Sequence, residues 1–489
     1  MSGSTPTLRQ PLAELPVLEA KPWRERVLAE LRAGARPLGL FGRLEGDRVL
    51  LTAILRAPGD RFLVHRGRAE AAIGYHELTT DYPALHCFER EVHEQTGLRV
   101  AGHPWLKPIR YSGAARMDDY PFYSIEGKEV HEVAVGPIHA GVIEPGAFRF
   151  QCLGEQVHHL EIHLGYQHRG VEALLLRGDP RRLAPLVETI AGDSSVAHAW
   201  AYVAAIEALS DCAPAAEVEL GRALMLELER AAMHLAGLSG LATDIGFLQG
   251  ATTYGRLRTT AINTSMRLCG SRFGRGALRP GGIAWSLSRE IRAEVAANIE
   301  LLEHDLAIIN DHFLTAQTVQ HRLRGVGVVS TAQATELGLV GMIARASGVP
   351  IDLRQGMSQG VYREIPVPPT VLSDGDCFAR AEIRVLELGT SLKLIKGILA
   401  ALPWGEPEPW KKPGALAPSA LLISLVEGWR GEVLHCLETS EAGALLHYKV
   451  QDPSLRNWMG LALAVRNNEI SDFPICNKSF DLSYCGNDL

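Results

Sequence analysis

The sequence predicts an α+β fold in which a small N-terminal α+β domain is followed by a large, mainly helical domain with peripheral β-strands. Short β-type runs separated by E-G-D and P-G-D turns occupy residues 38–67. Long apolar or amphipathic segments without turn residues dominate from residue 172 to 402. The chain has 489 residues, enough for about two to four domains at ~100–200 residues each.

The N-terminal part divides into an arm and a first domain. Residues 1–34 are predicted to form a polar arm that ends in a short helix, "PWRERVLAEL". Residues 35–111 are predicted to form the α+β domain, beginning with the strands of "LGLFGRLEGDRVLLTAILRAPGDRFLVHRG". The following "YPALHCFEREVHEQTGL" places Leu85, Phe88 and Val92 at helical spacing, which indicates a helix.

The second domain is predicted to span residues 131–489, after a polar, glycine-rich linker at 112–130. It begins with alternating residues around a Gly-Glu turn in "FRFQCLGEQVHHLEIHLGY", a pattern typical of two paired strands. Helices are then expected at 179–192, 195–209, 215–246, 288–314 and 377–402. The tail, residues 419–489, is expected to return to short strands and turns.

Composition excludes several classes of protein. A net charge of −7 and a pI near 6.2 argue against a nucleic-acid partner. The eight cysteines include no C-x-x-C pair, so the chain is predicted to bind no zinc or iron–sulfur cluster of its own. No apolar run is long enough for a membrane span and no secretory leader is present, which predicts a cytoplasmic protein.

Several blocks of the sequence resemble known redox subunits. Residues 81–111, "DYPALHCFEREVHEQTGLRVAGHPWLKPIRY", resemble the signature of the small C subunit of respiratory complex I. The later blocks occur in the order found in the D subunit of complex I and in the large subunit of membrane-bound [NiFe] hydrogenases, including the formate hydrogenlyase type. These blocks include "GPIHAGVIEPGAFRF", "HLGYQHRGVE", "LELERAAMHL", "GLVGMIARASGVPIDLR", "GDCFARAEIRVLE" and "EGWRGEVLHCL". The resemblance extends from about residue 35 to 489.

The resemblance also implies that the nickel ligands are missing. In the hydrogenases, two C-x-x-C pairs supply four thiolates to nickel and iron. The first pair falls on Ala191 and Ser194 here, and the second on Ser483 and Gly486. Cys485 lies one residue out of register and is more simply interpreted as a small core residue. We therefore expect no metal ligands in this chain.

In complex I, the corresponding cavity became the head of a quinone pocket. The quinone-binding histidine of that pocket falls on Pro145, beside Glu144, and the partner tyrosine falls on Gly192. Asp481 matches an aspartate shared by both families. The resemblance thus implies a polar, acidic cavity with Glu144, Asp193 and Asp481 as candidate catalytic residues, flanked by Ser194 and Ser483.

Three other residues match positions beside the proximal [4Fe–4S] cluster of a neighbouring small subunit. They are His168 and Arg169 in "HRG" and His234 in "ELERAAMHL". A cation at such a position would stabilise a reduced cluster and couple its potential to pH. The simpler alternative is that His168 and Arg169 hold a turn by bonding to carbonyl groups.

Other charged residues allow a structural and a functional interpretation equally. Glu229 and Arg230 could form an ion pair within a helix, and Glu172 could either cap the helix that it begins or carry a proton. Glu89 and Arg90, in "FERE", are expected to dock the first domain on its neighbours.

Three functions are compatible with the sequence. The first is the large subunit of a membrane-associated oxidoreductase complex that passes electrons from a partner's [4Fe–4S] cluster to a quinone-like or unknown acceptor. The second is a catalytically silent scaffold, and the third, which the missing thiolates oppose, is an active [NiFe] hydrogenase. The expected partners are a small subunit of the complex I B type and ion-pumping membrane subunits. They would hold the chain on the cytoplasmic face of the inner membrane.

Overall fold

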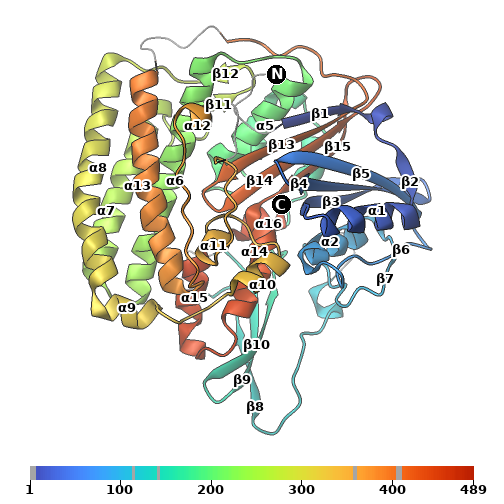
Figure 1. The fold of residues 1–489 in the computed structure, drawn as a ribbon, viewed down its shortest axis with the longest axis horizontal. Coiled ribbons are helices and arrows are strands. Elements are labelled where there is room, and N and C mark those ends of the chain that lie inside the picture. The colour runs from blue at the N-terminus through green and yellow to red at the C-terminus, as the bar shows by residue number, and fades with distance from the viewer. Residues whose placement is uncertain (1–6, 113–115, 140–143, 356–360, 403–409) are drawn as a thin grey trace.

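Helices and strands form three regions in the computed structural model, which describes residues 7–112, 116–139, 144–355, 361–402 and 410–489. A helical bundle lies on one side, a four-stranded sheet in the middle and the N-terminal domain on the other side (Figure 1). A separate three-stranded sheet projects from one end of the molecule. The mixed α and β character predicted from the sequence is therefore confirmed.

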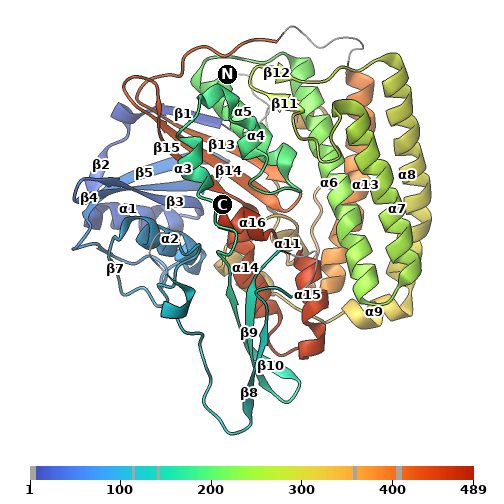
Figure 2. The same ribbon diagram turned by 180° about the vertical axis from the view of Figure 1, so that it is seen from behind.

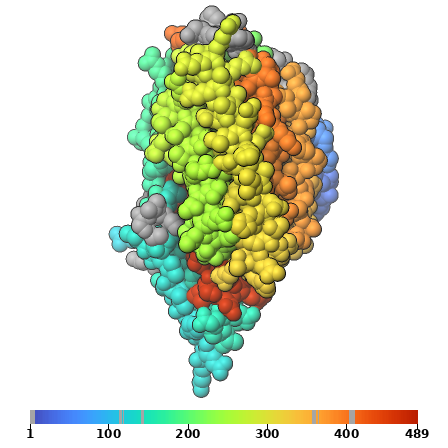
Figure 3. Space-filling model, turned by 90° about the vertical axis from the view of Figure 1, so that its left-hand side faces the viewer, coloured from blue at the N-terminus to red at the C-terminus, as the bar shows by residue number. Residues whose placement is uncertain are grey.

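The bundle contains the long helices α6 (Ala216–Asp244), α7 (Leu248–Cys269), α8 (Arg289–Thr315) and α13 (Cys377–Ala401). Three of these agree with the predicted ranges to within about two residues, as does α5 (Ser195–Leu209). The helix α7, rich in threonine and arginine, has no separate prediction because its apolar stripe is narrow: Tyr254, Leu257 and Ala261 are its fully buried apolar residues. Figure 3 shows the side of the molecule that α7, α8 and α9 (Gln317–Leu323) cover.

The helix predicted at 179–192 is wrong. Only a 3₁₀ turn (Pro180–Arg182) and the short α4 (Ala184–Val187) form there. Each begins with a proline in its first turn, and proline lacks the N–H that would continue a helix through it.

The central sheet corrects the prediction of peripheral strands. Its antiparallel order is β1 (Thr7–Pro11), β13 (Ala420–Gly428), β14 (Gly431–Thr439) and β15 (Leu445–Gln451). Every residue of β13 and β14 is buried. Leu422 and Val426 belong to the helical core on one face, whereas Leu421 and Ile423 pack with the N-terminal domain on the other. The two strands are buried on both faces because both faces are covered, and their buried residues include Glu427, Glu432 and His435 as well as apolar side chains.

The C-terminal tail is also more helical than predicted. After β15 the chain forms α14 (Pro453–Ala464), α15 (Phe473–Phe480) and α16 (Tyr484–Asp488). Each is short, and α14 and α15 have a proline in the first turn, so their composition resembles that of a turn-rich segment. Figure 2 shows α14, α15 and α16 beside the sheet, between the bundle and the N-terminal domain.

The N-terminal domain has a sheet of order β2-β5-β4-β3. Its strands are β2 (Val17–Glu19), β3 (Arg36–Glu45), β4 (Arg48–Ala57) and β5 (Arg61–Glu70), with a second pair β6 (Tyr75–His76) and β7 (Val100–Ala101). The helix α1 (Ala20–Arg32) lies on this sheet through Trp23, which has no exposed surface and donates to the His65 carbonyl at 3.0 Å. The predicted helix in 82–98 is α2 (His86–Thr96).

The remaining elements are the projecting sheet and several short helices and strands. The projecting sheet contains β8 (Val130–Val135), β9 (Ala147–Leu153) and β10 (Gln156–His163). The short elements are α3 (Val171–Leu175), α10 (Thr331–Glu336), α11 (Gly341–Ala346), α12 (Val361–Glu364), β11 (Leu278–Arg279) and β12 (Gly282–Ile283). Across the described ranges, no helix has the length and apolar character needed to cross a membrane.

A buried group of charges fixes the N-terminal domain to the central sheet. Glu91, on α2, pairs with Arg110 and lies 2.8 Å from Lys449 Nζ on β15. The exposed fraction of each of the three side chains is only 2–3%. Burial opposes the charge of Glu91, but Arg110 and Lys449 outweigh it and lower the pKa of Glu91 to about 2.

We predict that Glu91→Ala lowers the free energy of unfolding by ~3–5 kcal/mol, because two buried cations lose their shared partner. Urea denaturation measures this loss. The matched control is Glu70→Ala, whose half-exposed carboxylate pairs loosely with Arg48 at 3.8 Å and should cost less than ~1 kcal/mol. Equal losses in the two variants would show that the Glu91 cluster does not hold the domains together.

Candidate functional site

The three predicted catalytic acids meet at one cavity. Glu144, Asp193 and Asp481 all line a space of about 330 Å³, together with Gly192, Arg430, Asn477, Lys478 and residues 482–485. We call this space the acidic cavity. Its walls come from the segment before β9, the loop before α5, the β13–β14 turn and the C-terminal helices, which lie far apart in sequence.

Arg430 organises the acidic cavity. It lies in the two-residue turn between Gly428 and Gly431, which pair across β13 and β14. Its two terminal nitrogens each donate to a carboxylate oxygen of Asp193 at 2.7 Å, and its Nε donates to the Asp481 carbonyl. Burial opposes the charge of Arg430, but Asp193 outweighs it and raises the pKa of this guanidinium. Such a two-point contact fixes both the position and the charge of Asp193.

Asp481 ends α15 in a left-handed conformation, with φ +55° and ψ +48°. Aspartate tolerates this conformation better than most residues do. Its Oδ2 lies 4.0 Å from Arg384 Nη2, at the edge of ion-pair distance. Arg384 has no exposed surface, and its burial lowers its pKa to about 10. Asp481 therefore partly balances the charge of the buried Arg384. Asp481 also lines the acidic cavity.

Glu144 is positioned by the C-terminal helix. Its carboxylate accepts a hydrogen bond from the Tyr484 backbone N–H at 3.1 Å. The neighbouring Cys485 is a neutral thiol: burial, and then Glu144, raise its pKa to about 12. Its Sγ lies 3.4 Å from Ser483 Oγ.

The four positions that match the nickel ligands do not fit a metal. Ala191 is fully buried, and Ser194 Oγ accepts from Arg430 at 3.4 Å. Ser483 caps α16 by accepting from the Gly486 N–H at 2.9 Å. A Cβ at Gly486 would lie 2.6 Å from the Asp452 carboxylate carbon, so a cysteine there would clash. Over the described residues, no group of histidine, cysteine, aspartate or glutamate side chains is arranged to hold a metal ion.

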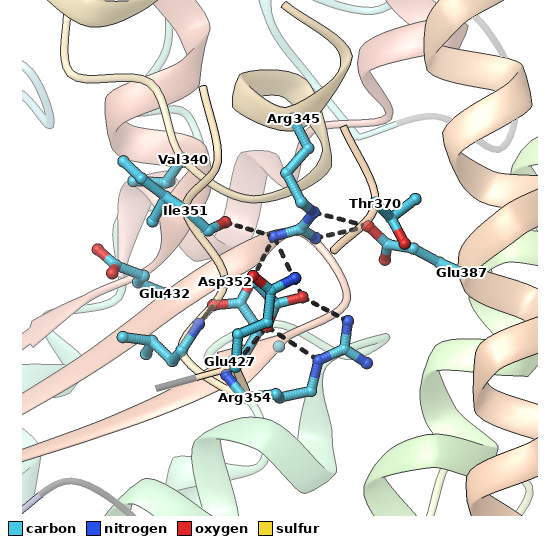
Figure 4. A network of polar contacts seen from close by, with 12 residues as sticks. Val340, Arg345, Ile351, Asp352, Arg354, Thr370, Glu387, Glu427 and Glu432 are labelled. Atoms are coloured by element: carbon cyan, nitrogen blue, oxygen red, sulfur yellow. Dashed lines mark hydrogen bonds and ion pairs between the residues drawn. The ribbon is translucent and has the colours of Figure 1, made fainter. Parts of the chain in front are cut away.

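A buried ion network supports the turn that carries Arg430. Arg345, on α11, donates to Glu387 of α13 at 2.8 Å and to Glu427 of β13 at 2.9 Å (Figure 4). Arg354 pairs with Asp352 at 2.7 Å and reaches Glu227 of α6 at 3.4 Å. The network thus joins three helices to the strand that leads directly into the Trp429–Arg430 turn.

His234 belongs to this network. It has no exposed surface, and its Nε2 lies 3.1 Å from Glu387. Burial lowers its pKa to about 4, although Glu387 opposes that shift. Its ring also contacts Trp429 edge-on, with centroids 6.1 Å apart. His234 therefore lies behind the wall of the acidic cavity, and a role beside a partner's cluster stays a prediction.

His168 and Arg169 lie beside the C-terminal residues of the chain, whereas His234 is buried in the network. His168 Nδ1 is 2.7 Å from the Asp488 carbonyl, and Arg169 donates to the Thr189 carbonyl at 2.8 Å. The Arg169 backbone N–H also donates to the Leu489 carbonyl at 2.9 Å. These carbonyl contacts show the turn-holding role directly. The cluster contact stays a prediction for both residues.

The other charged candidates have structural partners. Glu229 accepts from the Val196 and Ala197 N–H groups at 2.7 and 3.2 Å, whereas Arg230 bonds to Glu227 and to backbone carbonyls. Glu229 and Arg230 therefore have different principal partners. Burial raises the pKa of Glu229 to about 8.

Glu172 and Glu89 act within the chain. Glu172 bonds to Lys449 at 2.6 Å and to the Val450 N–H at 3.1 Å, so it joins the charges at the domain contact. Glu89 is buried, and its carboxylate accepts hydrogen bonds from the Leu78 and Thr79 N–H groups. Its expected role in docking on other subunits therefore has no support from its position.

Known proteins are similar to this chain in sequence. Residues 244–419 match the family described as the 49 kDa subunit of respiratory-chain NADH dehydrogenase. The membrane-bound hydrogenase subunit alpha of Pyrococcus furiosus is 28% identical over 364 residues, which cover 72% of this chain and 85% of the relative. The C/D subunit of NADH-quinone oxidoreductase from Bacteroides thetaiotaomicron is 30% identical over 326 residues, which cover 66% of this chain and 61% of the relative.

A solved structure agrees with the fold. A chain of the membrane-bound sulfane sulfur reductase, an archaeal respiratory membrane complex, superposes with a TM-score of 0.70 at 22% identity. The match covers 75% of this chain and 100% of the other. The likeness shows that the two chains share the same fold.

The chain is a relative of the large subunits of membrane-bound hydrogenases and of the C/D subunit of NADH-quinone oxidoreductase. The resemblance inferred from the sequence is therefore confirmed, as is the prediction of an oxidoreductase subunit.

Sequence reasoning missed the cations of the site. Arg430, Arg384 and Lys478 lie in the blocks "EGWRGEVLHCL", "GDCFARAEIRVLE" and "DFPICNKSF". A basic residue inside an otherwise apolar strand or helix is a signal, because a buried cation needs a partner. That signal does not say which carboxylate the cation meets.

We predict that Gly486→Ala lowers the free energy of unfolding by ~1–3 kcal/mol, because its Cβ meets the fixed Asp452 carboxylate. Thermal unfolding measures the loss. Gly389→Ala, in α13 with nothing within 4 Å of the added Cβ, is the control and should be neutral or stabilising by up to ~1 kcal/mol. Equal stability in the two variants would contradict the steric exclusion at the fourth ligand position.

Proposed function

We propose that this chain is the large subunit of a membrane-associated, energy-converting oxidoreductase complex related to complex I and to [NiFe] hydrogenases. In this proposal, electrons come from a [4Fe–4S] cluster in a partner subunit and reach a quinone-like acceptor at the acidic cavity. The observation that carries the proposal is the cavity itself, which brings Glu144, Asp193 and Asp481 together where the matched thiolate positions have no sulfur.

The lining of the acidic cavity suits the carbonyl groups of a quinone. Lys478 and Asn477 supply N–H donors on the same wall as Asp481. Asp193 is neutralised by Arg430, so it is a fixed acceptor for a hydroxyl group of the reduced form. Glu144 and Asp481 are the carboxylates through which a proton could reach the acceptor.

The partners follow from the same relationship. We infer a small [4Fe–4S] subunit of the complex I B type, because the sequence contains no C-x-x-C pair that could hold a cluster in this chain. Ion-pumping membrane subunits would hold the chain on the cytoplasmic face of the inner membrane, since its relatives include a membrane-bound hydrogenase subunit.

A catalytically silent scaffold is the second candidate, and one observation favours it. The carboxylates of Asp193 and Asp481 both have arginine neighbours, as expected for groups that only hold the C-terminal helices in place. In that case the buried network of Figure 4 would transmit movement between subunits without electron transfer. The third function, an active [NiFe] hydrogenase, requires a donor set that the described residues of the site do not provide.

Binding of a radiolabelled quinone analogue to the chain, in the complex with which it co-purifies, tests the proposal. We predict saturable binding of the reduced, hydroquinone form of the analogue, which Asp481→Asn weakens about tenfold, or by about 1.4 kcal/mol, because a hydroxyl group of the ligand loses a charged acceptor. Asparagine also accepts the left-handed conformation of residue 481, so the backbone is preserved.

The control for this experiment is Asp211→Asn, which removes a carboxylate that is 77% exposed and remote from the cavity lining. It should leave the affinity unchanged. A wild-type complex that binds no analogue would contradict the quinone site and favour the scaffold. Binding that is equally strong in Asp481→Asn would contradict the assignment of Asp481.

A further inference from the structure

We propose that a second cavity, between the two domains, binds a planar aromatic anion. This seam cavity has a volume of about 370 Å³ and is bounded by α2, the segment 104–111, β10 and α14. Figures 1 and 2 show α2, α14 and β10 at the place where the N-terminal domain meets the C-terminal part of the chain. The volume falls in the range of ~300–1,000 Å³ that is typical of small-molecule sites.

The walls of the seam cavity favour a flat ring. Trp105 and Tyr111 line it from the N-terminal domain, and Trp458 lines it from α14. Leu455 and Ala462 add apolar surface. Aromatic walls pack well against a planar ligand, through stacked or edge-on contacts.

Arg90 gives the seam cavity a buried positive charge, which Glu94 and Glu161 stabilise only from a distance. Only 9% of this residue is exposed, and its guanidinium lies 4.0 Å from the Trp105 ring centroid. Its N–H groups donate to the carbonyls of Lys107 at 2.6 Å and of Pro108 at 3.0 Å, and burial lowers its pKa to about 10. Within the described part of the chain, Arg90 forms no ion pair with a carboxylate. A buried cation without a directly paired anion raises the free energy of the folded protein. An anionic ligand bound beside Arg90 would therefore be stabilised.

The acidic residue in the wall of the seam cavity, Glu161, is paired with groups other than Arg90. Glu161 is already bonded to Lys107, lies 2.8 Å from His163 Nε2 and accepts from the Tyr123 N–H at 2.6 Å. Burial would raise the pKa of Glu161, but His163 and Lys107 lower it to about 2. Its charge is therefore balanced within the wall.

A second cation borders the seam cavity. Arg466 is exposed, and its Nη2 lies 3.2 Å from His159 Nδ1. Both residues line the cavity. An anion entering from solvent would thus be attracted by Arg466 and held deeper by Arg90.

Two ring nitrogens in the cavity wall also lack partners. Trp458 Nε1 and His86 Nδ1 are buried and have no hydrogen bond among the described residues. Indole nitrogen is only a donor, so it calls for an acceptor atom. Buried polar atoms without partners are uncommon and need an explanation; a ligand with polar ring substituents supplies one.

The seam cavity is separate from the acidic cavity, and its charge is opposite. The acidic cavity is lined by three carboxylates, whereas Arg90 and Arg466 dominate the seam cavity. The two share a wall, because Tyr484 of the acidic cavity packs edge-on against Trp458, with ring centroids 4.9 Å apart. The assignment does not depend on the proposed electron acceptor.

Titration calorimetry of the full-length chain with 2-naphthoate, and with neutral 2-naphthamide, tests this proposal. We expect 2-naphthoate to bind at one site and 2-naphthamide to bind about tenfold more weakly, because the amide lacks the charge. Ala462→Phe, which fills the cavity from α14, should abolish binding of 2-naphthoate. Arg466→Gln, at an exposed residue that does not threaten folding, should weaken it severalfold.

Arg182→Gln is the charge control, since the Arg182 side chain is 86% exposed and lies outside the cavity lining; it should leave the affinity unchanged. Absence of 2-naphthoate binding to the wild-type chain would overturn the proposal. Equal affinities for 2-naphthoate and 2-naphthamide, or equal affinities in the Arg466 and Arg182 variants, would overturn the assignment of an anion.

Discussion

The structure depends on the pairing of buried arginines with buried carboxylates at the point where α6, α11, α13 and β13 meet. Arg345 contacts both Glu387 and Glu427, and each of these three side chains is at most 1% exposed. Removing Arg345 would leave Glu387 and Glu427 buried with one cation fewer, and the loss of a partner by a buried charge costs far more than the pair itself contributes. The network therefore fixes β13, and through it the Trp429–Arg430 turn, more strictly than apolar packing alone would.

The geometry of the acidic cavity follows from that constraint. Because the turn is fixed, Arg430 can hold Asp193 and the Asp481 backbone together, and the C-terminal helices close the cavity from the other side. A metal site would need four thiolates around this space, yet Gly486 packs directly on Asp452, which His198 contacts at 3.1 Å. The residues around the positions that match the nickel ligands thus leave no room for the fourth thiolate and form a polar cavity.

Much of this arrangement could be predicted from the sequence. The apolar periodicity located α5, α6, α8 and α13, and the family resemblance located Glu144, Asp193 and Asp481. Periodicity could not show that β13 and β14 lie between two cores, since that depends on β1 and the N-terminal domain, more than 300 residues away. The partners of Arg430, Arg384 and Arg90 depend in the same way on how the chain folds back on itself.

The central claim is that the cavity kept its place in the fold and no longer holds nickel. Elemental analysis of the complex purified through this chain tests it most directly, by counting nickel atoms per chain. The account predicts a nickel content at the background level of a sample prepared in the same way without the chain. One nickel atom per chain would contradict it, because it would require a ligand set that Ala191, Ser194, Ser483 and Gly486 cannot supply.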